Sequence, residues 1–305
     1  MKHIVCYSGG HSSALVAIEV VRKYGKENVI LLNHNINPKY EVEDIKRFKK
    51  EVAQYLDLPI TYANYDGIEN ENYIPSQFEI AIKLKGFKFN GGQELCTYNL
   101  KTKPFYDYLK NNFPNKDCVV YYGFDSNELH RVERRKSILN DIDILSDFPL
   151  AVWGSIQYSY LIKYFTDQGK QFSTIAMVEK YRDTSDYIRT IESTLEIGIN
   201  PPNTCNVWKH ANCLGCLKAG KQHWYCVYVH ARDIFEEAKQ TESIIGYSII
   251  SEGVFLKDIE KEFEKMVIAG VPANEHIPAS KFWKSAKKYT KQNMQDLFPC
   301  ECWSN

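Results

Sequence analysis

Residues 2–13 read Lys-His-Ile-Val-Cys-Tyr-Ser-Gly-Gly-His-Ser-Ser, and this stretch decides how the first part of the chain folds. Its apolar start predicts a short buried strand over residues 2–7, and the apolar spacing of residues 12–24 predicts a helix directly after it. Two glycines between these elements let main-chain N–H groups approach an anion, and the helix N-terminus adds unpaired donors. The sequence therefore predicts a phosphate-binding loop, whose members are Ser8, Gly9, Gly10, His11, Ser12 and Ser13.

A plainer interpretation of the same residues stays open. Ser12 can cap the helix after a Gly-Gly turn, with no ligand involved. The loop lacks the Gly-Lys-Ser or Gly-Lys-Thr of a Walker loop, and it also lacks the spacing of the dinucleotide-binding glycines. A nucleotide bound here would therefore be held by a phosphate loop of another kind.

Strand and helix signals alternate outward along the chain. Strands are expected over residues 28–33, 60–65 and 118–123, with helices over residues 41–56 and 104–112. Buried apolar strands separated by helices are typical of a parallel sheet with right-handed crossovers. The expected fold class is therefore α/β, a Rossmann-like doubly wound parallel sheet.

The pattern changes after about residue 147. Helical spacing returns over residues 155–167, 185–197 and 231–241, and a cysteine-rich segment lies in the same half. We therefore expect a nucleotide-binding α/β domain over residues 1–150 and a mostly helical, cysteine-containing region over residues 151–305.

The composition narrows the class of protein. The 305 residues carry a formal net charge of zero with 44% apolar and 25% charged residues, which is ordinary for a soluble globular protein. A neutral chain has no global field that draws it to nucleic acid. Nine cysteines without a secretory leader or a membrane-spanning run indicate a reducing cytoplasm, where clustered thiols serve metal, cluster or redox chemistry.

The motif Ser-Gly-Gly-x-x-Ser after a first strand resembles the pyrophosphate loop (PP-loop) of the adenine-nucleotide alpha-hydrolase superfamily. That superfamily includes ATP pyrophosphatases, tRNA thiolases and phosphoadenosine-phosphosulfate (PAPS) reductases. The resemblance implies a loop that binds the phosphates of ATP or of a related sulfonucleotide. ATP-cleaving members carry an aspartate at the position of Ser12, and a serine cannot help hold Mg²⁺ as a carboxylate would. The loop therefore favours nucleotide binding more strongly than cleavage.

Residues 96–104 read Cys-Thr-Tyr-Asn-Leu-Lys-Thr-Lys-Pro, which resembles the Cys-Thr-x-x-Leu-Lys-x-x-Pro segment of PAPS-reductase-like proteins. The resemblance implies that Lys101 and Lys103 meet a phosphate or sulfate group. The plainer interpretation is a solvated loop that ends in Pro104, at the first turn of a helix.

Residues 123–135 are similar to the Gly-x-x-x-x-Glu-x-x-Arg turn of the same family. Such a turn lies at the carboxyl edge of the sheet, where open α/β sheets bind ligands. Gly123, Arg131 and Arg135 are therefore candidate nucleotide-site residues, although a solvated helix face paired with nearby glutamates explains the arginines equally well. His34 and Asn35 follow the second strand, where relatives contact adenine or ribose, and a turn before a proline would use the same residues.

Four cysteines gather within 22 residues at Cys205, Cys213, Cys216 and Cys226. A Cys-x-x-Cys pair brings two thiolates to one metal, and two further soft ligands complete a tetrahedral zinc or [4Fe–4S] site. Residues 210–224 are similar to a His-x-Asn-Cys-x-Gly-Cys-x-Lys-Ala-Gly region of PAPS-reductase-like proteins, some of which are associated with a [4Fe–4S] cluster. In the alternative, the Cys-x-x-Cys thiols are ordinary and Lys218 and Lys221 face a substrate.

Two more cysteines end the chain, at Cys300 and Cys302. True PAPS reductases carry a nucleophilic cysteine in a Glu-Cys-Gly-Leu-His tail, which Glu301-Cys302 echoes in part. Cys302 can attack an activated sulfate, the two thiols can complete the metal site, or the tail can serve neither purpose.

These resemblances cover most of the chain and imply a PAPS-reductase-like enzyme. In the expected reaction the loop holds ATP, with Mg²⁺ as an accompanying ion, while a substrate oxygen attacks the α-phosphorus and pyrophosphate leaves. Lys101 and Arg131 would stabilise the developing charge, and cysteines would supply sulfur from a sulfur donor. Two alternatives are a sulfonucleotide reductase in which Cys302 acts with a thioredoxin-like reductant, and a nucleotide-binding sensor or inhibitor without catalysis. Nucleic acid finds no support in the net charge, and homo-oligomerisation is left open.

Overall fold

The computed structural model describes residues 1–89, 92–155, 187–203, 207–209, 211 and 213–296 of the chain. These residues form two compact units. The first, here called the sheet unit, comprises residues 1–35, 43–69 and 103–203. The second, here called the helical unit, comprises residues 36–42, 70–102 and 204–305.

The expected boundary near residue 150 differs from this division. The chain passes between the units near residue 203, and two earlier segments join the helical unit. The reason is burial: Tyr40 from the first of these segments, and Phe78 and Phe87 from the second, are buried in the helical unit's core beside Trp224 and Phe235. The residues that share the core of the helical unit therefore come from separate segments of the sequence.

Five parallel strands form the sheet of the first unit, in the order β3-β2-β1-β4-β5. Register pairs Val5 on β1 with Leu31 on one side and Tyr121 on the other. The expected α/β class with a parallel sheet is therefore confirmed. The strands are β1 (Lys2–Cys6), β2 (Val29–Asn33), β3 (Ile60–Tyr62), β4 (Cys118–Tyr121) and β5 (Leu145–Asp147).

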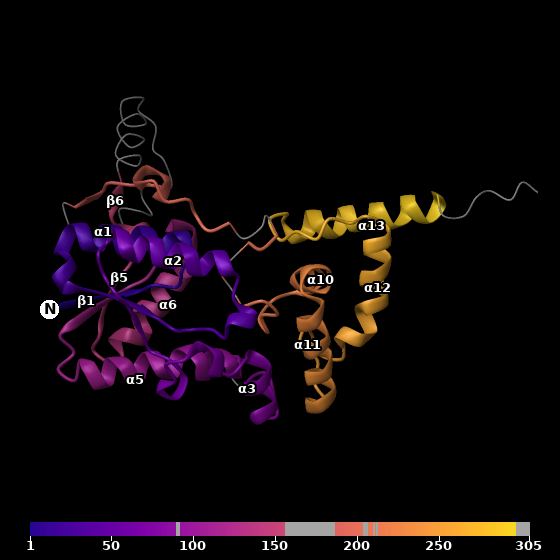
Figure 1. Cartoon of the computed structure of the whole chain (residues 1–305), viewed down its shortest axis with the longest axis horizontal. Helices are drawn as coiled ribbons and strands as arrows, with labels where there is room; N and C mark the ends of the chain where they lie inside the picture. Colours follow the sequence, from indigo (N-terminus) through magenta and orange to yellow (C-terminus); the bar gives the residue numbers. More distant parts are fainter. Residues whose placement is uncertain (90–91, 156–186, 204–206, 210, 212, 297–305) are drawn as a thin grey trace, which may run out of the picture. The chain divides into compact units, whose positions relative to one another are not determined.

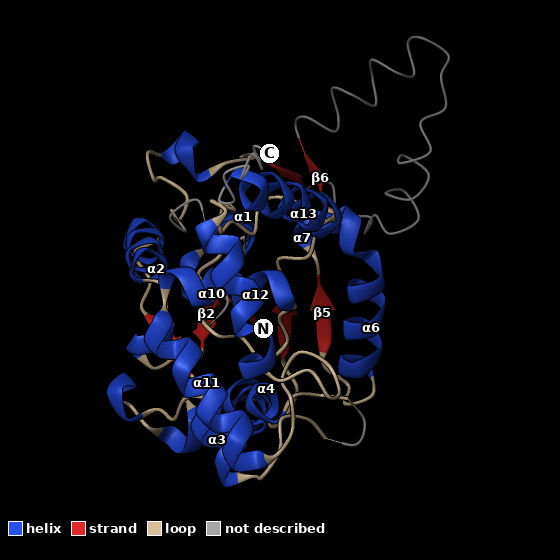
Figure 2. Ribbon diagram, turned by 90° about the vertical axis from the view of Figure 1, so that its right-hand side faces the viewer, coloured by secondary structure: helices blue, strands red, loops and turns tan. Residues whose placement is uncertain are grey.

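Helices cover both faces of this sheet, because successive strand residues point to opposite sides. Val5 and Leu31 pack on the side of α1 and α2, whereas Ile4 and Leu32 pack on the side of α5. Figure 1 shows α1 and α2 over one face and α5 over the other, and Figure 2 shows α6 alongside β5. The helices of the unit are α1 (His11–Tyr24), η1 (Lys26–Asn28), α2 (Glu43–Tyr55), η3 (Tyr65–Gly67), α5 (Lys103–Asn112), η6 (Ser126–Glu128), α6 (Leu129–Asn140), α7 (Pro149–Val152) and η7 (Thr194–Ile197).

The helix expected over residues 185–197 is wrong for the described part of that range. The chain instead forms the short strand β7 (Ile188–Arg189), which pairs with β6 (Gly154–Ser155), and the short helix η7. The backbone N–H groups of Thr190 and Ile191 donate to the buried carboxylate of Glu19, at 2.6 and 2.9 Å, instead of to helical carbonyls. The helix expected over residues 155–167 lies outside the described residues, except for its first residue.

The helical unit packs helices from distant parts of the chain around one core. Trp224, Phe235 and Phe263 are fully buried there, and α11 packs against α3, α10 and α12. Its elements are η2 (Pro38–Tyr40), η4 (Glu71–Tyr73), α3 (Gln77–Lys83), α4 (Leu95–Thr97), the π-helix η5 (Tyr98–Thr102), α10 (Lys221–His230), α11 (Arg232–Ile245), α12 (Leu256–Ile268) and α13 (Ala279–Asp296).

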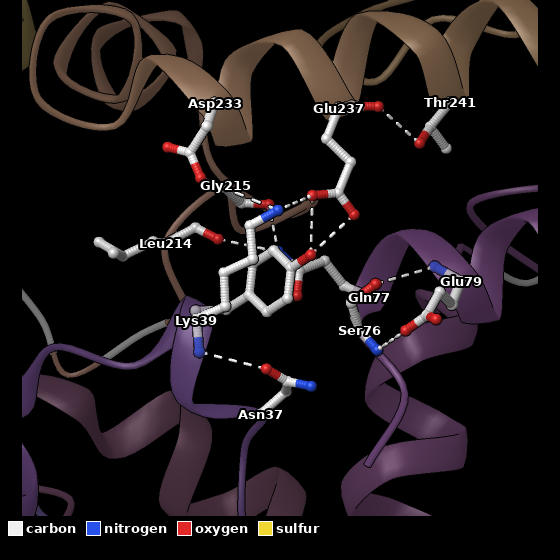
Figure 3. A network of polar contacts seen from close by, with 11 residues as sticks. Asn37, Lys39, Ser76, Gln77, Glu79, Leu214, Gly215, Asp233, Glu237 and Thr241 are labelled. Carbon is white, nitrogen blue, oxygen red and sulfur yellow. Dashed lines mark hydrogen bonds and ion pairs between the residues drawn. The ribbon is translucent and has the colours of Figure 1, made fainter. Parts of the chain in front are cut away.

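Polar contacts tie the early segments of this unit to its later helices (Figure 3). The Tyr40 hydroxyl donates to the carboxylate of Glu237 at 2.7 Å, and the Lys39 ammonium lies 2.7 Å from the same group. Gln77 donates through Nε2 to the carbonyl oxygen of Leu214 at 2.8 Å. Each bond joins residues more than a hundred positions apart, so the unit depends on long-range contacts.

Among the described helices, none combines the length and apolar character that crossing a membrane requires.

Candidate functional site

The carboxyl edge of the sheet has a topological switch point between β1 and β4. The chain passes from β1 to β2 and β3 on one side, and β4 lies on the other side of β1. Loops that leave neighbouring strands in opposite directions open a crevice in which α/β proteins bind ligands. The predicted phosphate loop follows β1 and the turn with Gly123 follows β4, so both lie at this point.

The backbone of the phosphate loop adopts, at Gly9, a conformation that only glycine readily allows. Gly9 has φ +84°, and a Cβ at this position would lie 2.7 Å from Cγ of Lys49 on α2. Gly10 is the N-cap of α1 and offers no side-chain cap, so the alternative in which Ser12 caps the helix is wrong. The first N–H groups of α1 therefore have no protein side chain as a cap.

Three serine hydroxyls line this loop in different ways. Ser13 is buried and donates to the carbonyl oxygen of Gly10 at 2.8 Å, and Ser8 donates to the Ser13 hydroxyl at 3.3 Å. Ser8 and Ser12 are exposed at the loop surface. Ser13 thus shapes the loop, while Ser8 and Ser12 lie at its surface, and their part in ligand binding stays a prediction.

Gly123 lies where a side chain would crowd the backbone of the loop. A Cβ at position 123 would lie 3.0 Å from both the carbonyl carbon of Ser12 and the amide nitrogen of Ser13. Contacts this short with backbone atoms are rarely tolerated, because neither partner can rotate away. The structure therefore brings Gly123 and the phosphate loop together, as the sequence motifs suggested.

His11 contacts the backbone of a segment that is distant in the sequence. Its Nε2 atom accepts a hydrogen bond from the backbone N–H of Thr194 at 3.2 Å, and burial lowers its pKa from the ordinary value of 6.5. A neutral imidazole that accepts here fastens the turn at η7 onto the start of α1. Among the six loop residues, His11 is thus a positioning residue.

His34 and Asn35 follow β2, at the same edge of the sheet. The Nδ1 atom of His34 donates to the carbonyl oxygen of Ala63, and the Asn35 backbone N–H donates to Oδ1 of Asn64 at 2.8 Å. These bonds tie the end of β2 to the residues after β3. The contacts orient both residues, and their part in nucleotide binding stays a prediction.

The three basic site residues predicted in the sheet unit have protein partners. The Arg131 guanidinium pairs with Glu128 and lies 4.1 Å from the ring centre of Phe124. Arg135 lies 5.3 Å from the ring centre of Tyr122. The Lys103 ammonium pairs with Asp107 at 2.9 Å. A ligand that recruits any of these charges must compete with its present partner, and such exposed pairs are weak.

Lys101 belongs to the helical unit and lies among cysteines. Proximity to the ionisable groups of Cys213, Cys216, Cys96 and Glu41 raises the pKa of the Lys101 ammonium against the opposing effect of burial. We call Cys96, Lys101, Cys213 and Cys216 the thiol–lysine cluster. An ammonium among thiols stabilises whichever of them loses its proton.

The pKa values of two thiols of this cluster, Cys96 and Cys216, are raised. Burial, followed by the charges of Cys213 and Cys216, raises the pKa of Cys96 to about 12, and Lys101 lowers it in part. Burial and the Cys213 charge likewise raise the pKa of Cys216, against a hydrogen bond from the Lys218 backbone and the charge of Lys101. Both are neutral thiols near neutral pH.

The four predicted metal ligands do not share one site among the described residues. Cys213 and Cys216 lie together in the thiol–lysine cluster, whereas Cys226 is buried on α10 in the helical core, where burial and the charge of Glu275 raise its pKa to about 12. Cys205 lies outside the described residues, as does Cys302. Within the described ranges, no three or more His, Cys, Asp or Glu side chains are arranged to hold a metal ion. Ligation of an iron–sulfur cluster or of zinc by these cysteines therefore stays a prediction.

Cys96 is the member of this group that the sequence did not assign. It lies five positions before Lys101, but more than a hundred positions before the Cys-x-x-Cys pair. The segment over residues 96–104 carried a usable signal, since a cysteine opens the motif that holds Lys101. The motif was interpreted through its lysines alone.

Comparison with known proteins gives one short similarity. The anaerobic ribonucleoside-triphosphate reductase-activating protein of Haemophilus influenzae is 31% identical to this chain over 84 residues. The aligned part is 27% of this chain and 53% of that protein, so the chain spans about half the length of the relative it matches. No family model matches the chain, and no solved structure does.

Proposed function

We propose that this protein binds ATP or a related adenine nucleotide through the loop Ser8–Ser13 and uses it in an enzyme reaction. The observation that carries the proposal is the position of this loop. It joins β1 to α1 at the switch point of a parallel sheet, with the Gly123 turn packed against its backbone. Phosphates are bound at such places by free N–H groups and by the positive end of the helix dipole.

The reaction that fits the loop is adenylation. A substrate oxygen attacks the α-phosphorus of ATP, the bond from that phosphorus to the bridging oxygen breaks, and pyrophosphate leaves with the electron pair. Main-chain donors of α1 and the exposed hydroxyls of Ser8 and Ser12 would meet the departing phosphates. Ser12 offers Mg²⁺ no carboxylate, so nucleotide binding is the firmer part of the proposal.

Thiol chemistry supports a second part of the function. Cys96, Cys213 and Cys216 lie near Lys101, whose charge lowers the pKa of Cys96 and of Cys216 against the effect of burial, and we propose that these thiols serve sulfur transfer or redox chemistry. The relative from Haemophilus influenzae is named as an activating protein of a reductase. From this similarity we propose only that the present protein has a role in enzyme chemistry. We propose the cytoplasm as the location, on the grounds of unpaired thiols.

Calorimetric titration of the full chain with ATP and with PAPS tests the proposal. Ser8→Ala removes one exposed hydroxyl from the loop and should weaken nucleotide binding by about tenfold. Ser137→Ala on the exposed face of α6 is the matched control and should leave binding unchanged.

Product analysis then separates the candidate reactions. Pyrophosphate release from ATP that is lost in Ser8→Ala supports adenylation. Sulfite release from PAPS with a dithiol reductant, lost in Cys302→Ser, would replace adenylation by sulfonucleotide reduction. Tight nucleotide binding without any turnover would point to a sensor. Equal affinity in Ser8→Ala and Ser137→Ala would remove the loop from the function.

A further inference from the structure

A cavity of about 380 Å³ lies within the helical unit, and it is lined by Cys216 and by Lys218 and Lys221, the two lysines that the sequence offered as substrate-facing residues. It is here called the lysine cavity, and its size suits a small-molecule ligand. Segments from three parts of the unit form it: the turn after residue 208, the start of α10 and the start of α13. Its polar and aromatic lining includes Lys209, Cys216, Lys218, Lys221, His223, Glu275 and Trp283.

Buried hydrogen bonds fix one wall of the cavity. His223 is buried, and its Nδ1 atom donates to Oε1 of Glu275 at 2.5 Å while its Nε2 atom accepts from the Cys216 backbone at 3.2 Å. Glu275 also accepts from the Lys209 backbone at 3.0 Å. Gln222 donates to the carbonyl oxygens of Asn274 and Ile277, at 2.6 and 3.0 Å. The wall is therefore preorganised, and Lys209 is held at its rim.

Ammonium groups outnumber carboxylates among the residues that line the cavity. Lys209, Lys218 and Lys221 line it, and Glu275 is the one carboxylate among the described lining residues. That carboxylate already accepts hydrogen bonds from His223 and from a backbone N–H. The lining therefore offers an anion more donors of positive charge than competing carboxylates.

Two of these lysines have carboxylate partners outside the cavity lining. Lys218 lies 3.1 Å from Glu94 and Lys221 lies 2.6 Å from Glu262. The Lys221–Glu262 pair is exposed and contributes little to stability, whereas the side chain of Glu94 is 11% exposed, so Lys218 is held by a largely buried carboxylate. A multiply charged anion among three ammonium groups would gain several charge-assisted hydrogen bonds at once.

The opposite side of the cavity is apolar. Ile277, Pro278 and Trp283 line it, and the Lys221 ammonium lies 5.2 Å from the ring centre of Trp283. An aromatic ring beside a lysine offers a planar ligand both stacking and charge. The cavity thus combines a site for an oxyanion with a surface for a flat or apolar group.

We propose that the lysine cavity binds a small molecule that carries a phosphate or sulfate group on a planar or apolar body. Lys209, Lys218 and Lys221 hold the oxyanion, and Trp283 contacts the body. The Cys216 thiol lies at the same cavity, so the bound molecule also covers one member of the thiol–lysine cluster. All lining residues of this cavity belong to the helical unit, whereas the phosphate loop belongs to the sheet unit.

Equilibrium dialysis of the full chain tests the proposal with four probes: inorganic phosphate, inorganic sulfate, phenyl phosphate and phenyl sulfate. The pair that binds more tightly identifies the oxyanion. Lys209→Gln should weaken binding by about tenfold, as should Lys218→Gln, because each removes one charge-assisted contact. Lys265→Gln, an exposed lysine on α12, is the charge-matched control.

Two further variants sharpen the result. Trp283→Leu should weaken the phenyl probes more than the inorganic ions, since only the phenyl group contacts the ring. Ser8→Ala should leave binding of all four probes unchanged, which separates this cavity from the phosphate loop whatever happens to ATP binding.

Lys209 is exposed and its backbone makes the contact to Glu275, so Lys209→Gln keeps the fold and decides the question if Lys218→Gln does not fold. The proposal is overturned if none of the probes binds at millimolar concentration. It is equally overturned if Lys209→Gln and Lys265→Gln bind the probes alike.

Discussion

Gly123 and Ser12 are in backbone contact, although 111 positions separate them in the sequence: a Cβ on Gly123 would lie 3.0 Å from the carbonyl carbon of Ser12. The contact joins the turn after β4 to the phosphate loop after β1. Because β1 and β4 are neighbours at the switch point, these two turns meet wherever the sheet forms.

Replacing Gly123 by alanine tests this contact. The added Cβ must displace backbone, so we expect the free energy of unfolding to fall by about 1–3 kcal/mol and nucleotide affinity to fall with it. Urea denaturation and calorimetric titration measure the two effects. Gly86→Ala is the control, because a Cβ there would meet only Cδ1 of Leu95 at 3.6 Å. Equal stability of the two variants would contradict the packing described here.

Glu19 is a buried carboxylate that organises the chain after residue 186. It accepts hydrogen bonds from the Tyr187 hydroxyl at 2.7 Å and from the backbone of Thr190 and Ile191. Glu19→Ala leaves these donors without an acceptor and should lower the free energy of unfolding by about 3 kcal/mol. The exposed Glu264→Ala on α12 should change it little in the same denaturation assay. A loss as small as in the control would mean that water replaces the carboxylate.

His11 predicts a pH dependence of stability. Burial lowers its folded-state pKa below 6.5, so the unfolded chain takes up this proton first as the pH falls. The His11 contribution is therefore present above pH 6.5 and is lost as the pH falls from there towards the folded pKa. His11→Gln keeps an acceptor for the Thr194 N–H but cannot titrate. Its unfolding free energy should vary less between about pH 7 and pH 5 than that of the unmodified chain.

His130→Gln is the control for this profile, since His130 is exposed on α6. It should keep the pH dependence of the unmodified protein. If His11→Gln and His130→Gln give the same curve, His11 does not act as the structure indicates.

Lys101 predicts the reactivity of its neighbouring thiols. Its charge lowers the pKa of Cys96 and of Cys216. Lys101→Met should therefore raise the pKa of both thiols and slow their alkylation by iodoacetamide several-fold. Lys101→Arg keeps the charge and should retain most of the rate. Mass spectrometry of the two cysteine peptides measures the rates, with Lys103→Met as the control, because that lysine pairs with Asp107. Unchanged rates in Lys101→Met would place the lysine outside the cluster.

Local patterns predicted the sheet unit well, because a parallel α/β sheet repeats in sequence order. The strand, the glycine loop and the helix over residues 2–24 were all expected, and so were helices at α2 and α5. The helix expected over residues 185–197 failed because the acceptor for Thr190 and Ile191 lies on Glu19, far away in sequence. No local window contains that carboxylate.

The helical unit was the harder part for the same reason. Its core joins residues near Tyr40 and Phe78 to helices after residue 220, so a single boundary at residue 150 could not describe it. The association of Cys96 and Lys101 with Cys213 and Cys216, and the lysine cavity, arise from this long-range packing.

The sequence by itself determined the strand, glycine loop and helix around Ser8–Ser13, because these elements follow one another within a few residues and need no distant partner. It also determined the class of fold, since alternating apolar strands and helices can close in few ways. The tertiary structure decided which residues meet: Gly123 with the loop, His11 with Thr194, and Lys101 with three cysteines. Such contacts arise because burial of apolar side chains brings together residues that are far apart in the sequence. Short sequence patterns contain no information about these distant partners.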